Sequence, residues 1–166
     1  MKAARTGVMA AAILATTAFF AAAQEARETG RVHRDWQEAC EPGDAGREVC
    51  FIFQRLSYRG RTAANVTIGY KATSGGPVAV VNMPLGAVLL PDGLRIETDG
   101  GIDGWAPFRF CDVRGCHVET EFEPKLLAAL KAGSQGWLVF RDLKEQEIRL
   151  PFSLIGLTAG LQSLRR

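Results

Sequence analysis

Hydrophobic and polar residues alternate along several short stretches of this chain, and the clearest example runs from Phe108 to Phe122. The alternation continues through the whole stretch (Phe108 and Phe110 around Arg109, then Val118, Thr120 and Phe122 against His117, Glu119 and Glu121). A period of two places one set of side chains in a core and the other in water, which is typical of a β-strand. The stretch therefore predicts two strands joined by a tight turn, with Cys111 and Cys116 at the two ends of that turn.

Similar patterns predict further strands, and turn formers separate them. The expected strands are residues 31–40, 49–56, 66–71, 78–83, 88–90, 94–98, 135–142 and 147–152. A short helix is expected from Pro124 to a stop at Gly133, and a last helix with a leucine stripe is expected to be capped by Ser153. A series of short strands at regular spacing with turns between them predicts a mainly β fold, an antiparallel sandwich or barrel with one or two short helices near the C-terminus.

The first residues have the features of an exported protein. Lys2 and Arg5 precede an apolar run over residues 8–20, and Ala21-Ala22-Ala23 follows it, as in a secretory signal peptide. An uncleaved anchor is disfavoured, because a bilayer needs about 20 apolar residues. We expect a signal peptide over residues 1–23, a flexible N-terminus over 24–30 and a single domain over 31–166. The expected location is the periplasm, with outer-membrane association or secretion left open.

Charge and hydropathy limit the partners of the mature chain. Of 20 basic and 18 acidic residues, the leader removes Lys2 and Arg5, so the mature chain carries no net charge. Nucleic-acid binding is not expected, since it requires a basic excess or stripe. No second apolar run approaches membrane length, so no transmembrane span is expected in the mature chain.

Four cysteines in an exported chain favour structural disulfides. Neither Cys40 and Cys50 nor Cys111 and Cys116 have the Cys-x-x-Cys spacing of a thiol oxidoreductase. Four cysteines allow three connectivities. Loop entropy favours the long-range pairings, whereas the two predicted turns bring the local pairs close together. We give geometry precedence and expect Cys40–Cys50 and Cys111–Cys116, with redox or metal roles as the alternative.

Residue chemistry does not identify a reaction. His33 lies near the mature N-terminus and His117 on the polar side of its strand, so both are expected to be peripheral. The stretch from Asp99 to Gly104 superficially resembles a calcium loop, but Phe110 stands where an EF-hand needs glutamate. No nucleophile elbow, P-loop or dinucleotide fingerprint occurs. We expect no catalytic, metal-binding or cofactor-binding residues.

Seven ordered motifs resemble the invasion-associated locus B family of bacterial exported proteins. They are Trp36-x-x-x-Cys40, Cys50-Phe-Ile-Phe-Gln54, Met83-Pro-Leu-Gly86, Leu94-x-Ile-x-Thr-Asp99-Gly-Gly101, Phe110-Cys111-x-x-x-Gly115-Cys116, Leu127-x-x-Leu130-Lys-x-Gly133 and Ile148-x-Leu-Pro-Phe-Ser153-Leu-x-Gly156. The set covers nearly the whole mature chain. Leu157 is a small departure, because the family often carries Phe after this glycine.

The resemblance implies an immunoglobulin-like β-sandwich in the bacterial envelope and, in some pathogens, a link to entry into host cells. It implies no catalytic residues. The expected function is therefore non-enzymatic binding of an envelope or host-surface protein, with an envelope enzyme or a redox or metal protein as alternatives. Loops 73–77 and 99–105 are the expected contact regions. Trp105 is the candidate contact residue because tryptophan is enriched in binding hot spots, and the alternative is that it only covers the end of the core.

Overall fold

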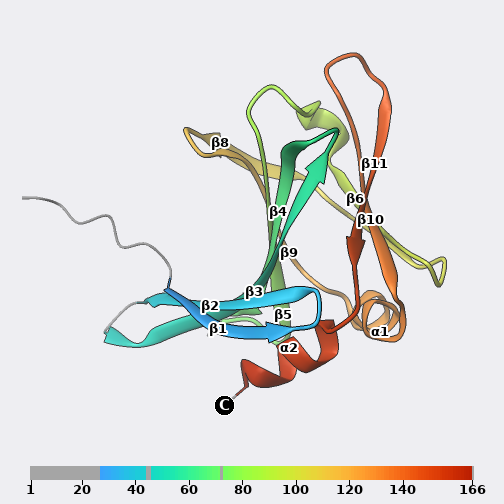
Figure 1. The fold of residues 1–166 in the computed structure, drawn as a ribbon. Coiled ribbons are helices and arrows are strands. Elements are labelled where there is room, and N and C mark those ends of the chain that lie inside the picture. The colour runs from blue at the N-terminus through green and yellow to red at the C-terminus, as the bar shows by residue number, and fades with distance from the viewer. Residues whose placement is uncertain (1–26, 44–45, 72, 166) are drawn as a thin grey trace, which may run out of the picture.

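The computed structural model describes residues 27–43, 46–71 and 73–165. In these ranges two antiparallel sheets pack face to face and two short helices cover one end (Figure 1). This confirms the mainly β sandwich expected from the alternating pattern. The expected signal peptide, residues 1–23, lies outside the described residues.

The larger sheet has seven strands and the smaller has four within the described ranges. In spatial order the larger sheet contains β1 (Arg27–His33), β2 (Trp36–Pro42), β3 (Glu48–Tyr58), β4 (Arg61–Tyr70), β5 (Pro77–Met83), β9 (Gly115–Glu121) and β8 (Phe108–Asp112). The smaller contains β11 (Glu147–Ser153), β10 (Gln135–Arg141), β6 (Leu94–Thr98) and β7 (Asp103–Ala106). The chain crosses between the sheets at Pro107, which separates β7 from β8.

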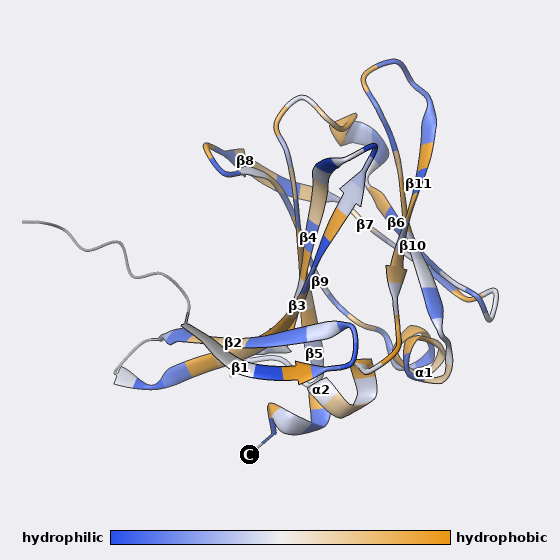
Figure 2. Ribbon diagram, in the orientation of Figure 1, coloured by the Kyte–Doolittle hydropathy of each residue, from blue (hydrophilic) through white to orange (hydrophobic). Residues whose placement is uncertain are grey.

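The core lies between the inner faces of the two sheets. Val66, Val81 and Val118 stand opposite one another on β4, β5 and β9, and each is at least nine-tenths buried. Leu138 and Leu150, a cross-strand pair on the smaller sheet, belong to the same cluster. Figure 2 shows hydrophobic residues where the sheets face each other. Burying each such side chain contributes about 1.5–3 kcal/mol, so this alternation is the main source of fold stability.

The N-terminal part of the domain differs from the sequence-based expectation. Residues 31–40 were expected to form one strand, but the chain turns at Arg34, which adopts a φ of 59°. The turn divides this segment into β1 and β2. Residues 27–30, expected to be flexible, belong to β1, and the backbone of Arg27 lies opposite Cys40. The turn lacks glycine and proline, and it is held from outside by a hydrogen bond from the Asp35 amide to the Ile155 carbonyl.

The two helices α1 (Pro124–Ala132) and α2 (Leu157–Ser163) lie at the lower end of the sandwich in Figure 1. Pro124 and Gly133 begin and end α1 as expected. Ser153 does not cap the last helix, because it is the final residue of β11 and pairs with Gln135. Residues 88–90 are not a strand either, and a 3₁₀ turn, η2 (Leu90–Asp92), leads into β6. Among the described residues no helix is long and apolar enough to span a membrane.

Candidate functional site

All four cysteines are paired between neighbouring strands. Cys40 on β2 bonds Cys50 on β3, and Cys111 on β8 bonds Cys116 on β9, with 4.0 Å between the Cα atoms in each pair. In both cases the two cysteines stand directly opposite each other in the ladder. Glu48 lies near the Cys40–Cys50 pair, but sulfur atoms bonded to each other do not offer the thiolates that metals bind. The pairing is the local one expected from the turns.

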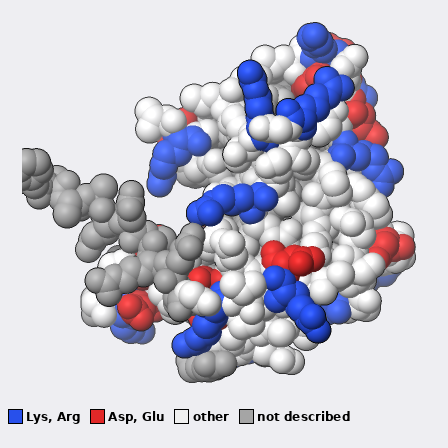
Figure 3. All heavy atoms as spheres, in the orientation of Figure 1, with Lys and Arg blue, Asp and Glu red and all other residues white. Residues whose placement is uncertain are grey.

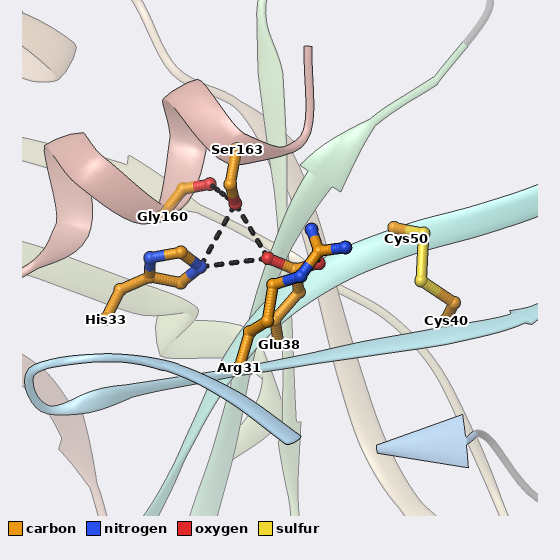
Figure 4. The surroundings of a disulfide bond; sticks show 7 residues. All are labelled: Arg31, His33, Glu38, Cys40, Cys50, Gly160 and Ser163. Atoms are coloured by element: carbon orange, nitrogen blue, oxygen red, sulfur yellow. Dashed lines mark hydrogen bonds and ion pairs between the residues drawn. A yellow bond between two sulfur atoms is a disulfide. The ribbon is translucent and has the colours of Figure 1, made fainter. Parts of the chain in front are cut away.

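A buried polar cluster joins β1, β2 and α2 (Figure 4). Glu38 is 2% exposed, and its carboxylate lies 2.9 Å from Nε2 of His33 and 2.8 Å from the hydroxyl of Ser163. Arg31 donates to the other carboxylate oxygen at 3.2 Å. Burial alone raises the pKa of Glu38, but the hydrogen bonds from His33 and Ser163 and the charge of Arg31 outweigh it, so the pKa lies below its ordinary value.

The cluster contains serine, histidine and glutamate but lacks the geometry of a catalytic triad. A triad needs one ring nitrogen facing the serine and the other facing the carboxylate. Here Nε2 of His33 faces both, at 3.1 Å from the Ser163 hydroxyl and 2.9 Å from Glu38. The Ser163 hydroxyl also lies 2.7 Å from the Gly160 carbonyl inside its own helix. The arrangement therefore attaches α2 to β2, and His33 is not the peripheral residue that the sequence suggested.

His117 is also more enclosed than expected, with 12% of its side chain exposed. Its Nε2 lies 3.0 Å from the Asp112 carboxylate, and the Phe110 ring stacks on it at 4.6 Å. The Asn82 amide nitrogen is 3.3 Å from both ring nitrogens, so it lies over the ring face. The hydrogen bond from His117, followed by the Arg114 backbone amide, holds the pKa of Asp112 well below its usual range. Strands on both sides thus hold the imidazole in one orientation.

This histidine lies at one side of a hollow on the outer face of the larger sheet, which we call the outer hollow. It has a volume of about 630 Å³ and is lined by Ala39, Glu41, Phe51, Phe53, Arg55, Asn65, Thr67, Val80, Asn82, Phe110, Arg114 and His117. The size is within the range of ligand and side-chain pockets in proteins. The lining comes from β2, β3, β4, β5 and β8, together with the β8–β9 turn and β9.

The outer hollow combines an apolar floor with polar walls. Phe53 is 6% exposed although it points away from the sandwich core, and Arg55 lies over its ring at 4.9 Å. Oδ1 of Asn65 is buried and has no hydrogen-bond partner among the described residues. Phe110 is 55% exposed and offers an aromatic surface at the rim. Such a mixture of aromatic floor and amide walls suits recognition of a ligand that is partly apolar and partly hydrogen-bonding.

One sequence signal could have revealed the outer hollow. In residues 50–53 no polar position interrupts the apolar run, so both faces of β3 carry apolar side chains. Ile52 enters the sandwich core, whereas Phe51 and Phe53 lie on the opposite face. A half-exposed strand would alternate, so the continuous run indicated a second apolar surface.

Trp105 lies elsewhere. It is 61% exposed on β7, an edge strand of the smaller sheet, and its Nε1 donates to the Asp92 carbonyl at 2.9 Å. Its ring packs on Gly93, where a Cβ atom would lie 2.6 Å from Nε1. It contributes to a smaller pocket of about 290 Å³ beside Arg95 and Arg141. The structure therefore does not bring Trp105 to the outer hollow.

The two loops expected to contact a partner are held by hydrogen bonds. The Asp99 carboxylate accepts bonds from the backbone amides of Ser134 and Gln135 and from the Ser134 hydroxyl. These hydrogen bonds lower the pKa of Asp99, and the bond from the Ser134 amide has the largest effect. In the other loop the Ser74 hydroxyl lies 2.8 Å from the Gly76 carbonyl. Asp99 thus joins its loop to the start of β10.

A family model and a solved structure both relate this chain to the same family. The family model described as invasion associated locus B (IalB) protein matches residues 36–165. The crystal structure of invasion associated protein B from Bartonella henselae is similar in fold, with a TM-score of 0.67 and 23% identity over 81% of this chain and 94% of that one. No curated protein matches the chain. The family model spans both disulfides and both sheets from β2 onward, and the chain belongs to the invasion associated locus B family.

Proposed function

We propose that this protein is an exported, non-enzymatic β-sandwich of the bacterial envelope that binds a protein or another surface component through the outer hollow. The observation that carries the proposal is the hollow itself, an aromatic surface on the side of the sheet that does not face the sandwich core. Exposed aromatic residues beside hydrogen-bonding groups are typical of protein interfaces. We propose the periplasm as its location, with the outer membrane or the exterior as further destinations.

The polar clusters support a binding role. The Ser163 hydroxyl and the Glu38 carboxylate are enclosed, so a substrate does not reach them without displacement of α2. His117 is held between Phe110 and Asn82, and its Nε2 faces Asp112. These contacts stabilise one side of the hollow and present Phe110 at its rim. Contact with host cells is the extension of the proposal that the family name suggests.

Site-specific photo-crosslinking tests the proposal. A photoreactive residue at Phe110 in cells should capture a specific partner from the envelope, whereas the same residue at Ile155, which is 51% exposed at the other end of the molecule, should not. The purified partner should then bind the Phe110→Ala variant at least fivefold more weakly than the unmodified protein, a typical loss for a hot-spot residue. Trp105 remains our second candidate contact. The affinity of the partner for the Trp105→Ala variant measures the contribution of Trp105 to binding.

Two outcomes would contradict the proposal. Equal affinity of the partner for the Phe110→Ala and unmodified proteins would remove the outer hollow from the binding role. Turnover of an envelope substrate by the purified protein, without any captured partner, would favour an enzyme. Free-thiol titration and metal analysis of the same preparation address the redox and metal alternatives.

A further inference from the structure

Three connections of the larger sheet reach the same end of the molecule, opposite the helices. They are the β3–β4 turn, the β5–β6 connection and the β8–β9 turn (Figure 1). Strands β3, β4, β5, β9 and β8 are consecutive neighbours in the sheet, so their ends are adjacent. The β8–β9 turn packs directly on β5, because a Cβ at Gly115 would collide with the Met83 carbonyl. We call this surface the tip surface and define it by Tyr58, Arg59, Arg61, Leu85, Val113 and Arg114.

Each connection exposes a large apolar side chain. Val113 at the β8–β9 turn is 96% exposed, Leu85 is 57% exposed and Tyr58 is 39% exposed. Each residue lies at or beside a turn, not on a sheet face, and no described element packs over it. Exposed apolar residues on projecting turns, close to cations, are the composition of surfaces that enter the membrane interface.

The tip surface is also cationic. Arg59 and Arg61 form no ion pair with any carboxylate in the described parts of the chain, and the Arg59 guanidinium lies 5.1 Å from the centre of the Tyr58 ring. Arg114 pairs with Asp112, the acidic neighbour in these turns. From residue 49 to residue 91 the sequence contains no aspartate or glutamate. Figure 3 shows Lys and Arg at this end of the molecule, and others elsewhere on the same face.

The backbone of the β3–β4 turn fixes the position of one arginine. Tyr58 pairs with Arg61, which leaves a two-residue loop, and both loop residues have positive φ, 50° at Arg59 and 76° at Gly60. Two-residue hairpins of this kind prefer asparagine followed by glycine. Arginine is therefore not the residue that the turn geometry favours at position 59, and its charge at the tip needs another explanation.

We propose that the tip surface docks onto a membrane surface rich in anionic phospholipids, with the arginines at the phosphates and Val113 and Leu85 in the acyl boundary. Cations attract the negative headgroups. The exposed apolar side chains add burial in the acyl boundary, whereas binding to a soluble acidic protein would require the cations alone. This inference does not require a partner in the outer hollow, and Arg114 is the residue that both surfaces share. No described helix of this protein spans a bilayer. Contact through the tip surface would hold the protein at a membrane without such a helix.

Vesicle co-sedimentation tests the inference with the full chain, purified with both disulfides formed. Binding is expected to vesicles of phosphatidylcholine and phosphatidylglycerol, and not to phosphatidylcholine alone. Each cation near the surface raises binding about fivefold, so Arg59→Asn with Arg61→Gln should weaken it more than tenfold. Asparagine suits the turn, so this loss does not reflect unfolding. Leu85→Ser with Val113→Ser should also weaken binding, with unchanged melting.

Control variants lie at the other end of the molecule. Lys125→Gln with Lys131→Gln removes two exposed cations of α1, and Ile155→Ser removes an exposed apolar residue. These variants should bind as the unmodified protein does. Equal weakening by the control and tip variants would overturn the inference, as would equal binding to neutral vesicles. Retention on polyglutamate without any vesicle binding would assign the tip surface to an acidic protein and would also overturn it.

Discussion

The hydroxyl of Ser163 lies 2.8 Å from the carboxylate of Glu38, although 125 residues separate them in the chain. This contact holds a seven-residue helix against β2. A helix of that length does not form alone in water, so α2 depends on its packing and on this buried cluster.

Replacing Glu38 with glutamine should destabilise the protein at neutral pH by about 2 kcal/mol, because hydrogen bonds to a charged group are stronger than neutral ones. Because the pKa of the folded carboxylate lies below the ordinary 4.5, the carboxylate stabilises the fold above that pH. This stabilisation is lost as the pH falls through the lower, folded pKa. Urea unfolding at several pH values should therefore show less acid destabilisation in Glu38→Gln. Asp112, whose pKa is also lowered, retains part of the pH dependence, and an unchanged profile would contradict the prediction.

Alanine at Gly156 should destabilise the fold far more than alanine at Gly86. Both glycines have positive φ, 95° and 73°, which costs an L-residue about 1–2 kcal/mol. Around Gly86 there is open space, whereas a Cβ at Gly156 would collide with the His33 carbonyl. We expect about 1–2 kcal/mol for Gly86→Ala and more than about 3 kcal/mol for Gly156→Ala, because the clash adds to the conformational cost. Thermal melting of both variants checks the difference, and similar losses would contradict it.

The side-chain amide of Gln54 pairs with the backbone of Ser153 across the two sheets. Its Nε2 donates to the Ser153 carbonyl at 2.8 Å and its Oε1 accepts from the Ser153 amide at 3.1 Å. Gln54→Leu removes both bonds and leaves the partly buried Ser153 amide without this partner, while the Ser153 carbonyl keeps the bond from Trp36 Nε1, so the loss should be about 1–2 kcal/mol. Gln37→Leu, at an exposed position of β2, is the matched control and should change stability by less than about 0.5 kcal/mol. Urea unfolding followed by tryptophan fluorescence measures both.

Removal of either disulfide should reduce stability without abolishing the fold. Cys111→Ser with Cys116→Ser opens a loop with a sequence separation of 5, and Cys40→Ser with Cys50→Ser one of 10. Chain entropy assigns about 2 kcal/mol to the first and about 3 kcal/mol to the second. Urea unfolding gives the two values. Non-reducing peptide mapping checks the pairing, and a Cys40–Cys111 peptide would contradict it.

Sequence periodicity was informative where one side of a strand faces the core. Val66, Ile68 and Tyr70 alternate in the sequence, and all three belong to or pack against the core cluster on β4. Pro124 and Gly133 likewise bound α1, because proline suits a first helical turn and a glycine commonly ends one. The cysteine pairs follow from turn geometry, since each pair lies in neighbouring antiparallel strands. These features depend on local conformation, which the residues themselves determine.

The candidate sites depend on contacts that local patterns do not encode. The His33–Glu38–Ser163 cluster requires α2 to dock against β1 and β2, and the outer hollow requires six neighbouring strands in register with the β8–β9 turn. Periodicity identifies which side chains share a face of a strand, but not which element covers that face. The sequence by itself therefore determined most of the strands, the local disulfides and the family. Only the tertiary structure decided the burial of both histidines, the outer hollow and the tip surface, because each is assembled from segments far apart in the chain.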